Sequence, residues 1–380
     1  MSRHRATRAV RAGVESDAAH GAVMPPLHLA ANYTFAALGN KRRYDYGRSA
    51  NPTRDLLGEA LADLENGTTG IVTSSGMSAI ALALQLVPTG RLVVAPHDCY
   101  GGTYRLLHAL ARREHFRVAF VDQRDPQAVA AAFAAAPHLV WIETPSNPLL
   151  RIADIRTLAT QAHARGALVA VDNTFLSPLL QQPLGLGADL VVHSTTKYLN
   201  GHSDVVGGAV VAKDRAVGDE LAWWGNALGV TGAPFDAWLT LRGLRTLHVR
   251  MRQHEANAQA VAEMLTVHPA VAAVHYPGLA SHPGHALAAR QQSGFGGMLS
   301  FELRDGLPAV ERLTSRLRCF SLAESLGGVE SLVAHPATMT HAAMEAQARR
   351  RAGIGDGLVR LSIGIEAVED LLADLRGALA

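Results

Sequence analysis

The sequence has few cysteines and no excess of either charge. Its 380 residues include two cysteines, Cys99 and Cys319, which are far apart and outside any CxxC pattern. This argues against a disulfide scaffold and against a cysteine-based zinc site. The 35 basic and 33 acidic residues give a formal net charge of +2, too small to favour nucleic acid or a membrane surface as a partner.

Long apolar runs are also missing. No stretch of about 18 apolar residues is present, so we expect no membrane-spanning helix. The first residues, MSRHRATRAVRAG, carry charges without an apolar segment behind them, unlike a secretory signal. The 18 histidines show no HxxxH spacing with a third ligand, so we expect no metal site. With 48% hydrophobic residues, these absences indicate a globular, cytoplasmic protein with a large core.

Changes in polarity divide the chain into three regions. Residues 1–50 are polar and turn-rich, and we expect an N-terminal arm that packs on another surface. Residues 51–250 alternate short apolar runs with amphipathic ones, which predicts a large α/β domain with a mostly parallel sheet. Residues 251–380, entered through a helical pattern at 244–265, resemble a smaller α+β domain. Strands are predicted over 70–76, 91–96, 116–122, 138–144, 168–174, 189–194, 207–212, 296–303, 321–327 and 358–366.

Candidate ligand-binding residues follow several predicted strands, because open parallel sheets bind ligands at the carboxyl ends of their strands. Gly76 and Met77 begin a helix after IVTSS, and a helix N-terminus can hold a phosphate. A plain strand-to-helix turn is the alternative, since neither GK[ST] nor GxGxxG is present. Tyr100, beside two glycines, can stack on a flat ligand. Asp172 ends the run LVAV, where it either caps a helix or faces a ligand cation.

Lys197 lies in the hydroxyl-rich segment HSTTKYLNGHSD, directly after the apolar run DLVV. Taken alone, a solvated lysine is the simpler interpretation. A lysine that must lose its proton, or form an imine, needs such a setting. Taken with a phosphate-binding helix start, an aromatic ring and an aspartate, it indicates pyridoxal 5'-phosphate (PLP) held on Lys197 as a Schiff base.

Several longer segments resemble the Cys/Met-metabolism PLP enzymes. The resemblance runs from YDYGRSANPTRD to LVRLSIGIE, which is nearly the whole chain, and it implies the PLP-dependent transferase fold of type I. The other matching segments are HSTTKYLNGHSDVVGG, PHDCYGGTYR, ETPSNPLL, VDNTF and ESLGGVESL.

This resemblance implies a role for each candidate residue. Asp172 would pair with the pyridine nitrogen, Tyr100 would stack on the ring and take part in catalysis with Lys197, and Thr174 would contact the cofactor. The implied phosphate ligands are Gly76, Met77, Ser194 and Thr196, with Tyr46 and Arg48 from a neighbouring subunit. The implied substrate ligands are Arg360, which grips the carboxylate, and its helpers Asn147 and Ser325.

Within this family, the sequence most resembles the members that perform γ-replacement. These join an O-acylhomoserine, with the succinyl ester favoured, and cysteine to give cystathionine in methionine biosynthesis. Two other reactions would use the same residues and remain alternatives: cleavage of cystathionine at its γ-carbon, and replacement of the ester group by sulfide. We expect Arg105 to bind the succinyl carboxylate and Glu324 the amino group of cysteine, although both are otherwise ordinary exposed charges. Because the arm would complete a neighbouring site, we expect a homotetramer of two active dimers.

Overall fold

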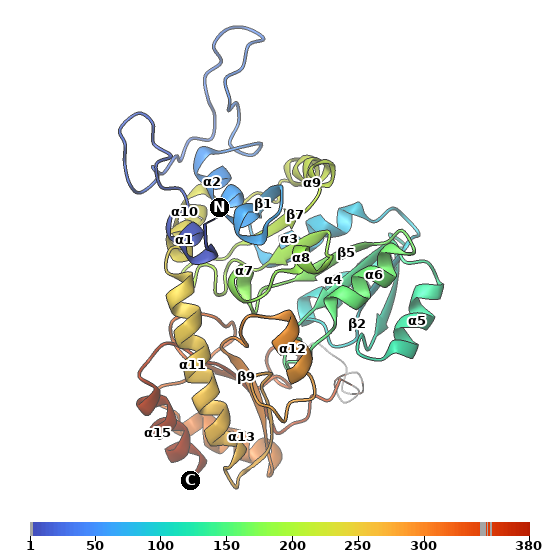
Figure 1. The fold of residues 1–380 in the computed structure, drawn as a ribbon, viewed down its shortest axis with the longest axis vertical. Helices are drawn as coiled ribbons and strands as arrows, with labels where there is room; N and C mark the ends of the chain where they lie inside the picture. Colours follow the sequence, from blue (N-terminus) through green and yellow to red (C-terminus); the bar gives the residue numbers. More distant parts are fainter. Residues whose placement is uncertain (1–2, 343–346, 348, 350–351) are drawn as a thin grey trace.

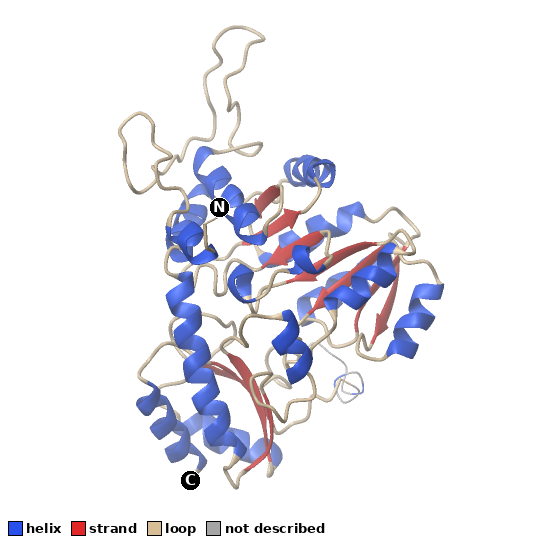
Figure 2. Cartoon of the chain, viewed as in Figure 1, coloured by secondary structure: helices blue, strands red, loops and turns tan. Residues whose placement is uncertain are grey.

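Two β-sheets organise the protein in the computed structural model, which describes residues 3–342, 347, 349 and 352–380. Within these residues the larger sheet has seven strands, in the order β1-β7-β6-β5-β4-β2-β3, and the smaller has five, in the order β10-β11-β12-β9-β8. Figure 1 shows the larger sheet above the smaller one, with α11 (Leu247–Thr266) along one side of the molecule. Figure 2 shows the same two groups of strands in red.

The larger sheet is parallel at its centre and antiparallel at one edge. Strands β3, β2, β4, β5 and β6 run parallel to their neighbours, whereas β7 runs antiparallel to both β6 and β1. The expected mostly parallel sheet is confirmed, and a strand lies in each of the seven segments predicted for it. The strands are β1 (Thr69–Thr73), β2 (Leu92–Pro96), β3 (Arg117–Val121), β4 (Leu139–Glu143), β5 (Leu168–Asp172), β6 (Leu190–His193) and β7 (Gly208–Ala212).

Residues of the central strands alternate between two cores, one on each face of the sheet. In β4, Val140 and Ile142 pack on one face, while Leu139 and Trp141 pack on the other. Burial on both faces explains why these strands are nearly continuous apolar runs. The first face is covered by α2 (Pro52–Glu65), α5 (Pro126–Ala134), α6 (Ile155–His163), α8 (Pro183–Leu186) and α10 (Pro234–Leu244). The second is covered by α3 (Gly76–Ala83), η1 (Leu84–Leu86), α4 (Gly101–Arg112) and α9 (Arg215–Leu228), and α7 (Ser177–Leu180) follows β5.

The smaller sheet differs from the prediction in three places. Strands β8 and β11 were not predicted, and the strand predicted over 321–327 is wrong beyond Leu322. Ser325 has a φ of 81°, in the left-handed region, so an extended strand cannot continue through it. The strands are β8 (Val271–His275), β9 (Met298–Leu303), β10 (Ser321–Leu322), β11 (Leu332–Ala334) and β12 (Leu358–Ser362), with helices α12 (His285–Gln291), α13 (Gly306–Arg316) and α15 (Val368–Leu379).

The N-terminal arm is in part regular. It begins with α1 (Arg5–Val10), which the sequence analysis did not predict. This helix is tied to the body, because Ala9 is fully buried and the Arg5 guanidinium donates to the Pro178 carbonyl at 3.1 Å. The chain between α1 and α2 then forms loops that project from the body (Figure 1). The start of the arm therefore packs on its own subunit, and so does Pro25, whose carbonyl accepts from Trp238 Nε1 at 2.9 Å.

Helix α11 packs against the cores of both sheets. Leu247 and Met251 belong to a core of the larger sheet, and Val261 and Leu265 to the core of the smaller one. The predicted boundary between residues 250 and 251 falls inside this helix. We propose that the two domains meet along α11 and are held by it.

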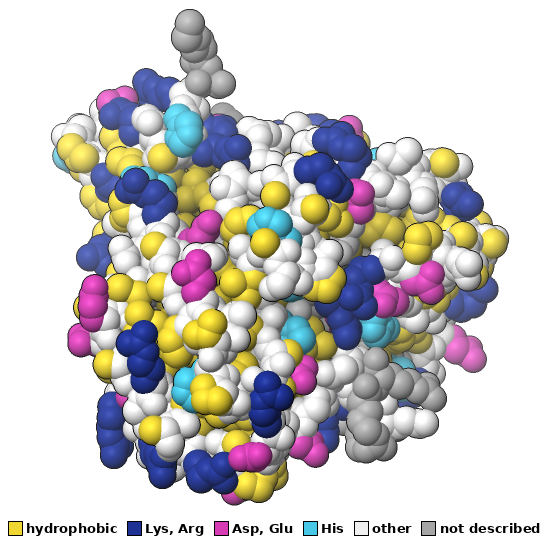
Figure 3. Space-filling view, turned by 60° about the horizontal axis from the view of Figure 1, so that its bottom comes forward, with side chains coloured by type: hydrophobic (Ala, Val, Ile, Leu, Met, Phe, Trp, Pro, Cys, Tyr) yellow, Lys and Arg dark blue, Asp and Glu magenta, His cyan; other side chains and the backbone are white. Residues whose placement is uncertain are grey.

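The surface shows both charges together. On the face in Figure 3, basic and acidic side chains are interspersed with apolar ones. In the part of the chain that the structure describes, no helix combines the length and apolarity needed to cross a membrane.

Candidate active site

Lys197 lies in the turn after β6, and its amine points at the smaller domain. Lys197 Nζ donates to Ser325 Oγ at 2.6 Å. Burial and the nearby Arg360 cation lower the pKa of Lys197 to about 8, while Glu324 opposes the shift. A lysine with this pKa is partly neutral near physiological pH, as a nucleophile or a base must be.

Arg360 lies in β12 and meets the same serine. Its guanidinium is buried, and burial lowers its pKa to about 10. It donates to Asn147 Oδ1 at 3.1 Å and to the Ser325 carbonyl at 2.8 Å. The left-handed backbone of Ser325 thus presents its hydroxyl to Lys197 and its carbonyl to Arg360. Four of the predicted residues are therefore in direct contact.

The start of α3 lies against Ser194. A Cβ atom added to Gly76 would be 2.8 Å from Ser194 Cβ, so only glycine permits this approach. Ser75 caps the helix by accepting from Ser78 N, which leaves the N–H groups of Gly76 and Met77 without a partner inside the helix. The Thr196 hydroxyl accepts from Gly207 N at 3.0 Å and donates to its carbonyl at 3.2 Å.

Asp172 ends β5 and is held by Thr174 in a local turn. Thr174 N donates to Asp172 Oδ1 at 3.0 Å, and Thr174 Oγ1 accepts from Ser194 N at 2.9 Å. Helix α7 begins at Ser177 without a side-chain cap, so Asp172 is not the helix cap that was the alternative. Burial raises the pKa of Asp172, which is the cost of holding a carboxylate away from water.

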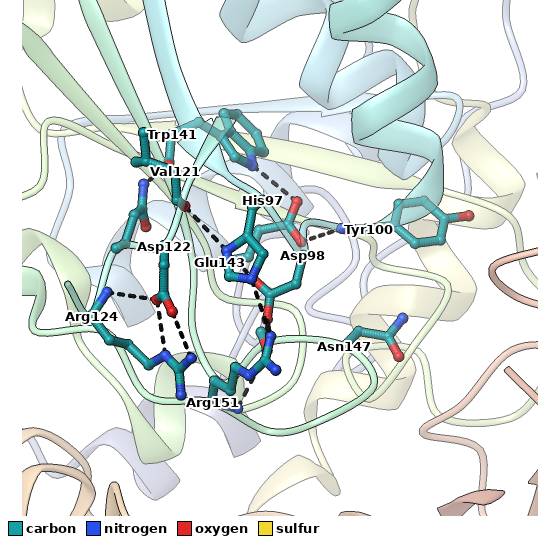
Figure 4. A network of polar contacts seen from close by, with 12 residues as sticks. His97, Asp98, Tyr100, Val121, Asp122, Arg124, Trp141, Glu143, Asn147 and Arg151 are labelled. Carbon is teal, nitrogen blue, oxygen red and sulfur yellow. Dashed lines mark hydrogen bonds and ion pairs between the residues drawn. The ribbon is translucent and has the colours of Figure 1, made fainter. Parts of the chain in front are cut away.

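Tyr100 stands at the end of β2, at the N-terminus of α4. Tyr100 N donates to Glu143 Oε2 at 2.6 Å, and the side chain remains 40% exposed. A Cβ atom added to Gly102 would be 2.5 Å from the Tyr100 ring and 2.6 Å from Met77 Sδ. Gly102 therefore lets the ring and Met77 come together. Figure 4 shows Tyr100 and Asn147 on neighbouring loops, with the Glu143 carboxylate bonded to the main-chain nitrogen of Tyr100.

A buried ion pair holds these two loops together. Asp98 Oδ2 accepts from Ser146 Oγ at 2.9 Å and from the Arg151 guanidinium at 3.0 Å (Figure 4). Asp98 belongs to the loop that carries Tyr100, and Ser146 to the loop that carries Asn147. The network thus holds the loop of Tyr100 against the loop of Asn147.

Tyr46 and Arg48 lie on the arm and do not join the Lys197 cluster of this subunit. The Arg48 guanidinium donates to the Asn226 carbonyl at 2.7 Å and to Asn226 Oδ1 at 2.8 Å, on α9. It also lies 5.6 Å from the centre of the Tyr46 ring, which is half exposed.

Arg105 and Glu324 are exposed charges. Arg105 is the fifth residue of α4, and its guanidinium lies near Gly101. Glu324 lies next to Ser325, and its charge raises the pKa of both Lys197 and Arg360. Of the two, Glu324 has the clearer electrostatic link to the site.

Comparison with known proteins identifies the family. The family model described as Cys/Met metabolism PLP-dependent enzyme matches residues 6–380. The chain belongs to this family. It is 55% identical to the cystathionine gamma-synthase of Escherichia coli, covering 99% of this chain and 97% of the relative. It is also 46% identical to a cystathionine beta-lyase of Lactococcus lactis, covering 98% of each chain.

Solved structures agree with the family. The cystathionine gamma-synthase of Xanthomonas oryzae, in complex with aminoacrylate and cysteine, is 62% identical with a TM-score of 0.99. That match covers 100% of this chain and 98% of the other, and a second structure of the Xanthomonas protein holds cystathionine. The expected fold of type I, with a large and a smaller sheet, is confirmed.

The residues of the site fit the PLP on which the family depends. Lys197 offers an amine with a lowered pKa, and Asp172 a partly buried carboxylate at a strand end. Gly76 and Ser194 bring a helix N-terminus and a hydroxyl together, as a phosphate requires. Among the residues described, no group of three or more His, Cys, Asp or Glu side chains is arranged to hold a metal ion.

Sequence analysis missed Glu143, Asp98 and Arg151. Glu143 ends an apolar strand just as Asp172 does, so the strand-end rule that selected Asp172 also points to it. Asp98 and Arg151 are 53 residues apart, and no sequence pattern links them.

Proposed function

We propose that this chain is a PLP-dependent enzyme that joins an O-acylhomoserine to cysteine and produces cystathionine. One structural observation supports the proposal: Ser325 contacts both the Lys197 amine, which we propose as the base, and the Arg360 guanidinium, which we propose to bind the substrate carboxylate. The gamma-synthase relatives, at 55% and 62% identity over nearly full length, support the choice of reaction.

The cofactor would be held at the ends of four strands, β1, β2, β5 and β6. Lys197 would bind it covalently, Asp172 would pair with its ring nitrogen, and Tyr100 would stack on its ring. The residues proposed for its phosphate are Gly76, Met77, Ser194 and Thr196, with Thr174 supporting Ser194. Thr196 already donates to the Gly207 carbonyl, so it would have to exchange that bond to donate to the phosphate. Bound PLP withdraws electrons from Cα of an amino acid, which makes the proton on Cα acidic.

Lys197 would move the protons of the reaction. Once released by the incoming amino acid, its amine would take the proton from Cα of the acylhomoserine, give it up, and, neutral again, take one from Cβ. The carboxylate of the ester would then leave from Cγ, the cysteine thiol would add at the same carbon and lose its proton, and Lys197 would return protons to Cβ and Cα. The flexible stem of Lys197 can reach both positions, and its pKa near 8 keeps a fraction of the amine neutral.

Arg360 would fix the substrate by its α-carboxylate. Its guanidinium is buried and oriented by Asn147 and Ser325, so little side-chain freedom is lost on binding. Glu324 would hold the cationic amino group of the incoming cysteine. Arg105 would bind the distal carboxylate of a succinyl ester, which favours that ester over the acetyl one.

Each site would be shared between subunits of a homotetramer. Tyr46 and Arg48 have no contact with Lys197 in their own chain, as far as the described residues go, and they lie on a projecting arm. Apolar arm side chains are exposed there, including Leu29 and Leu38. Amino acids are the expected small-molecule partners, and a cytoplasmic location remains a prediction.

A panel of substrates tests the proposal. Succinyl-, acetyl- and phosphohomoserine would each be supplied with cysteine or with sulfide, and products identified by mass spectrometry. We expect cystathionine from the succinyl ester and cysteine to form fastest. Faster addition of sulfide would assign a sulfhydrylase, and faster cleavage of added cystathionine would assign a lyase; either result contradicts the proposal.

A further inference from the structure

Two acidic residues end neighbouring strands of the larger sheet. Glu143 ends β4 and Asp172 ends β5, and the two are direct partners in the parallel register. Neighbouring strands are about 4.8 Å apart. Because side chains alternate along a strand, both acids lie on the same face as Trp141 and Ala170. The two carboxyl groups are therefore side by side.

Glu143 is held by neutral donors. Its Oε2 accepts from Tyr100 N at 2.6 Å and its Oε1 from Trp141 Nε1 at 3.0 Å (Figure 4). Its side chain is buried, and so is Cys99 beside it. Among the described residues, His193 lies near enough to bear on Asp172, but its ring bonds to Glu65.

A buried carboxylate and a partly buried one at this spacing repel each other. Burial, and then the charge of Asp172, raise the pKa of Glu143 to about 8. The pair therefore tends to keep one proton at neutral pH unless a cation faces it. A protonated pyridine nitrogen is such a cation, and Asp172 is the residue placed to meet it.

We propose that Glu143 is a positioning residue for the cofactor: it supplies a second negative charge behind Asp172 that keeps the ring nitrogen protonated. The same carboxylate holds the main chain of Tyr100, the residue proposed to stack on the ring. Glu143 thus acts on two groups: Asp172, proposed to pair with the ring nitrogen, and Tyr100, proposed to stack on the ring. This inference rests on the proposed cofactor site and adds a residue to it.

A cofactor analogue separates the charge from the hydrogen bond. The dissociation constants of PLP, and of its analogue with a C–H group in place of the ring nitrogen, would be measured on cofactor-free wild type and on Glu143→Gln. The analogue cannot carry the ring charge. We expect Glu143→Gln to weaken PLP at least about tenfold more than it weakens the analogue, since the lost charge acts through the ring nitrogen.

Two variants serve as controls. Glu143→Asp keeps the charge, and Trp141→Phe removes one donor while leaving Glu143 in place. Both should keep the preference for PLP over the analogue within about twofold of wild type, because neither removes the charge. If Glu143→Gln does not fold, the double variant Glu143→Gln/Trp141→Phe replaces it, since its amide then meets one N–H donor instead of two.

The outcomes separate this inference from the proposed function. Equal weakening of both ligands would mean that Glu143 acts only through Tyr100 or the fold, and would overturn this inference alone. A wild-type protein that binds neither ligand would overturn the proposed function as well. Selective weakening of PLP supports both.

Discussion

Lys197 is buried and lies near the Arg360 cation, and both effects lower the pKa of its amine. With a pKa near 8, about one amine in ten is neutral at pH 7, against fewer than about one in a thousand for an ordinary lysine. Only the neutral amine attacks the PLP aldehyde. The rate of covalent attachment to the cofactor-free protein should therefore rise with pH and level off above about pH 8.

Borohydride reduction at timed intervals, followed by peptide mass analysis, measures this rate. Lys197→Ala is the control and should give no reduced cofactor–lysine peptide. A rate that still climbs at pH values far above 8, or a reduced peptide at another lysine, would refute the assignment.

Arg105 provides a test of substrate choice. Replacing it by alanine should lower kcat/KM for the succinyl ester about tenfold, because a hydrogen bond between two charged groups is lost, and should leave the acetyl ester nearly unchanged. The side chain is exposed, so the effect should lie at the low end for such bonds. Arg112→Ala, at the other end of α4, is the matched control. An equal loss for both esters would show that Arg105 does not read the acyl group.

At the scale of single residues, the sequence predicts which side chains lie at the ends of strands, but not which residues they contact. Lys197 and Asp172 could be selected because each follows a buried strand. The contacts of Ser325 with Lys197 and Arg360 span 128 and 35 residues, and depend on one left-handed backbone angle. The bond from Arg48 to Asn226 likewise depends on how the arm folds back.

Among the elements, α11 bonds to the chain next to Lys197 and to the chain next to Arg360. One face carries Arg250, His254 and Asn257, spaced about one helical turn apart. Arg250 donates to the carbonyls of Tyr198 and Gly243, next to the turn of Lys197. His254 and Asn257 bond to the carbonyls that follow β12, the strand of Arg360. The helix thereby fixes the position of Lys197 relative to Arg360.

Replacing Arg250 by methionine should therefore destabilise the protein. Two buried carbonyls lose their donors, so we expect a loss of about 3–5 kcal/mol in the free energy of unfolding. Arg252→Met, on the exposed side of the same helix, should change it by less than about 0.5 kcal/mol. Urea unfolding of both variants measures the difference. Similar values for the two would show that the buried bonds of Arg250 contribute little.

Elements buried on both faces were predicted well, and short or half-exposed ones were not. All seven strands of the larger sheet gave apolar runs, because both faces are covered. Strand β11 has three residues and β8 has an irregular register with β9, so neither gives a clear alternation. Helix α1 has six residues and one buried side chain, too little for a periodic pattern.

For the molecule as a whole, we propose that the arm extends each active site over two chains. Its loops project from the body, and the side chains of Val23, Leu29 and Phe35 are at least half exposed. A folded monomer gains nothing from leaving such side chains in water, whereas a symmetric partner would cover them. If the arm of a partner supplies Tyr46 and Arg48, a chain with a substitution in its arm and a chain with a substitution in its body should together form some intact sites.

Mixing Lys197→Ala chains with Arg48→Ala chains tests this sharing. A hybrid dimer has one site with neither defect, formed by the Arg48→Ala body and the arm of the Lys197→Ala chain. Random reassembly after unfolding should restore about a quarter of wild-type activity, since half of the dimers are hybrids and half of their sites are intact. Lys197→Ala chains mixed with Lys197→Ala/Arg48→Ala chains are the control, because every site in them lacks the lysine. Activity that stays at the level of the separate parents would place the whole site within one chain, and Arg48 would then serve only its bonds to Asn226.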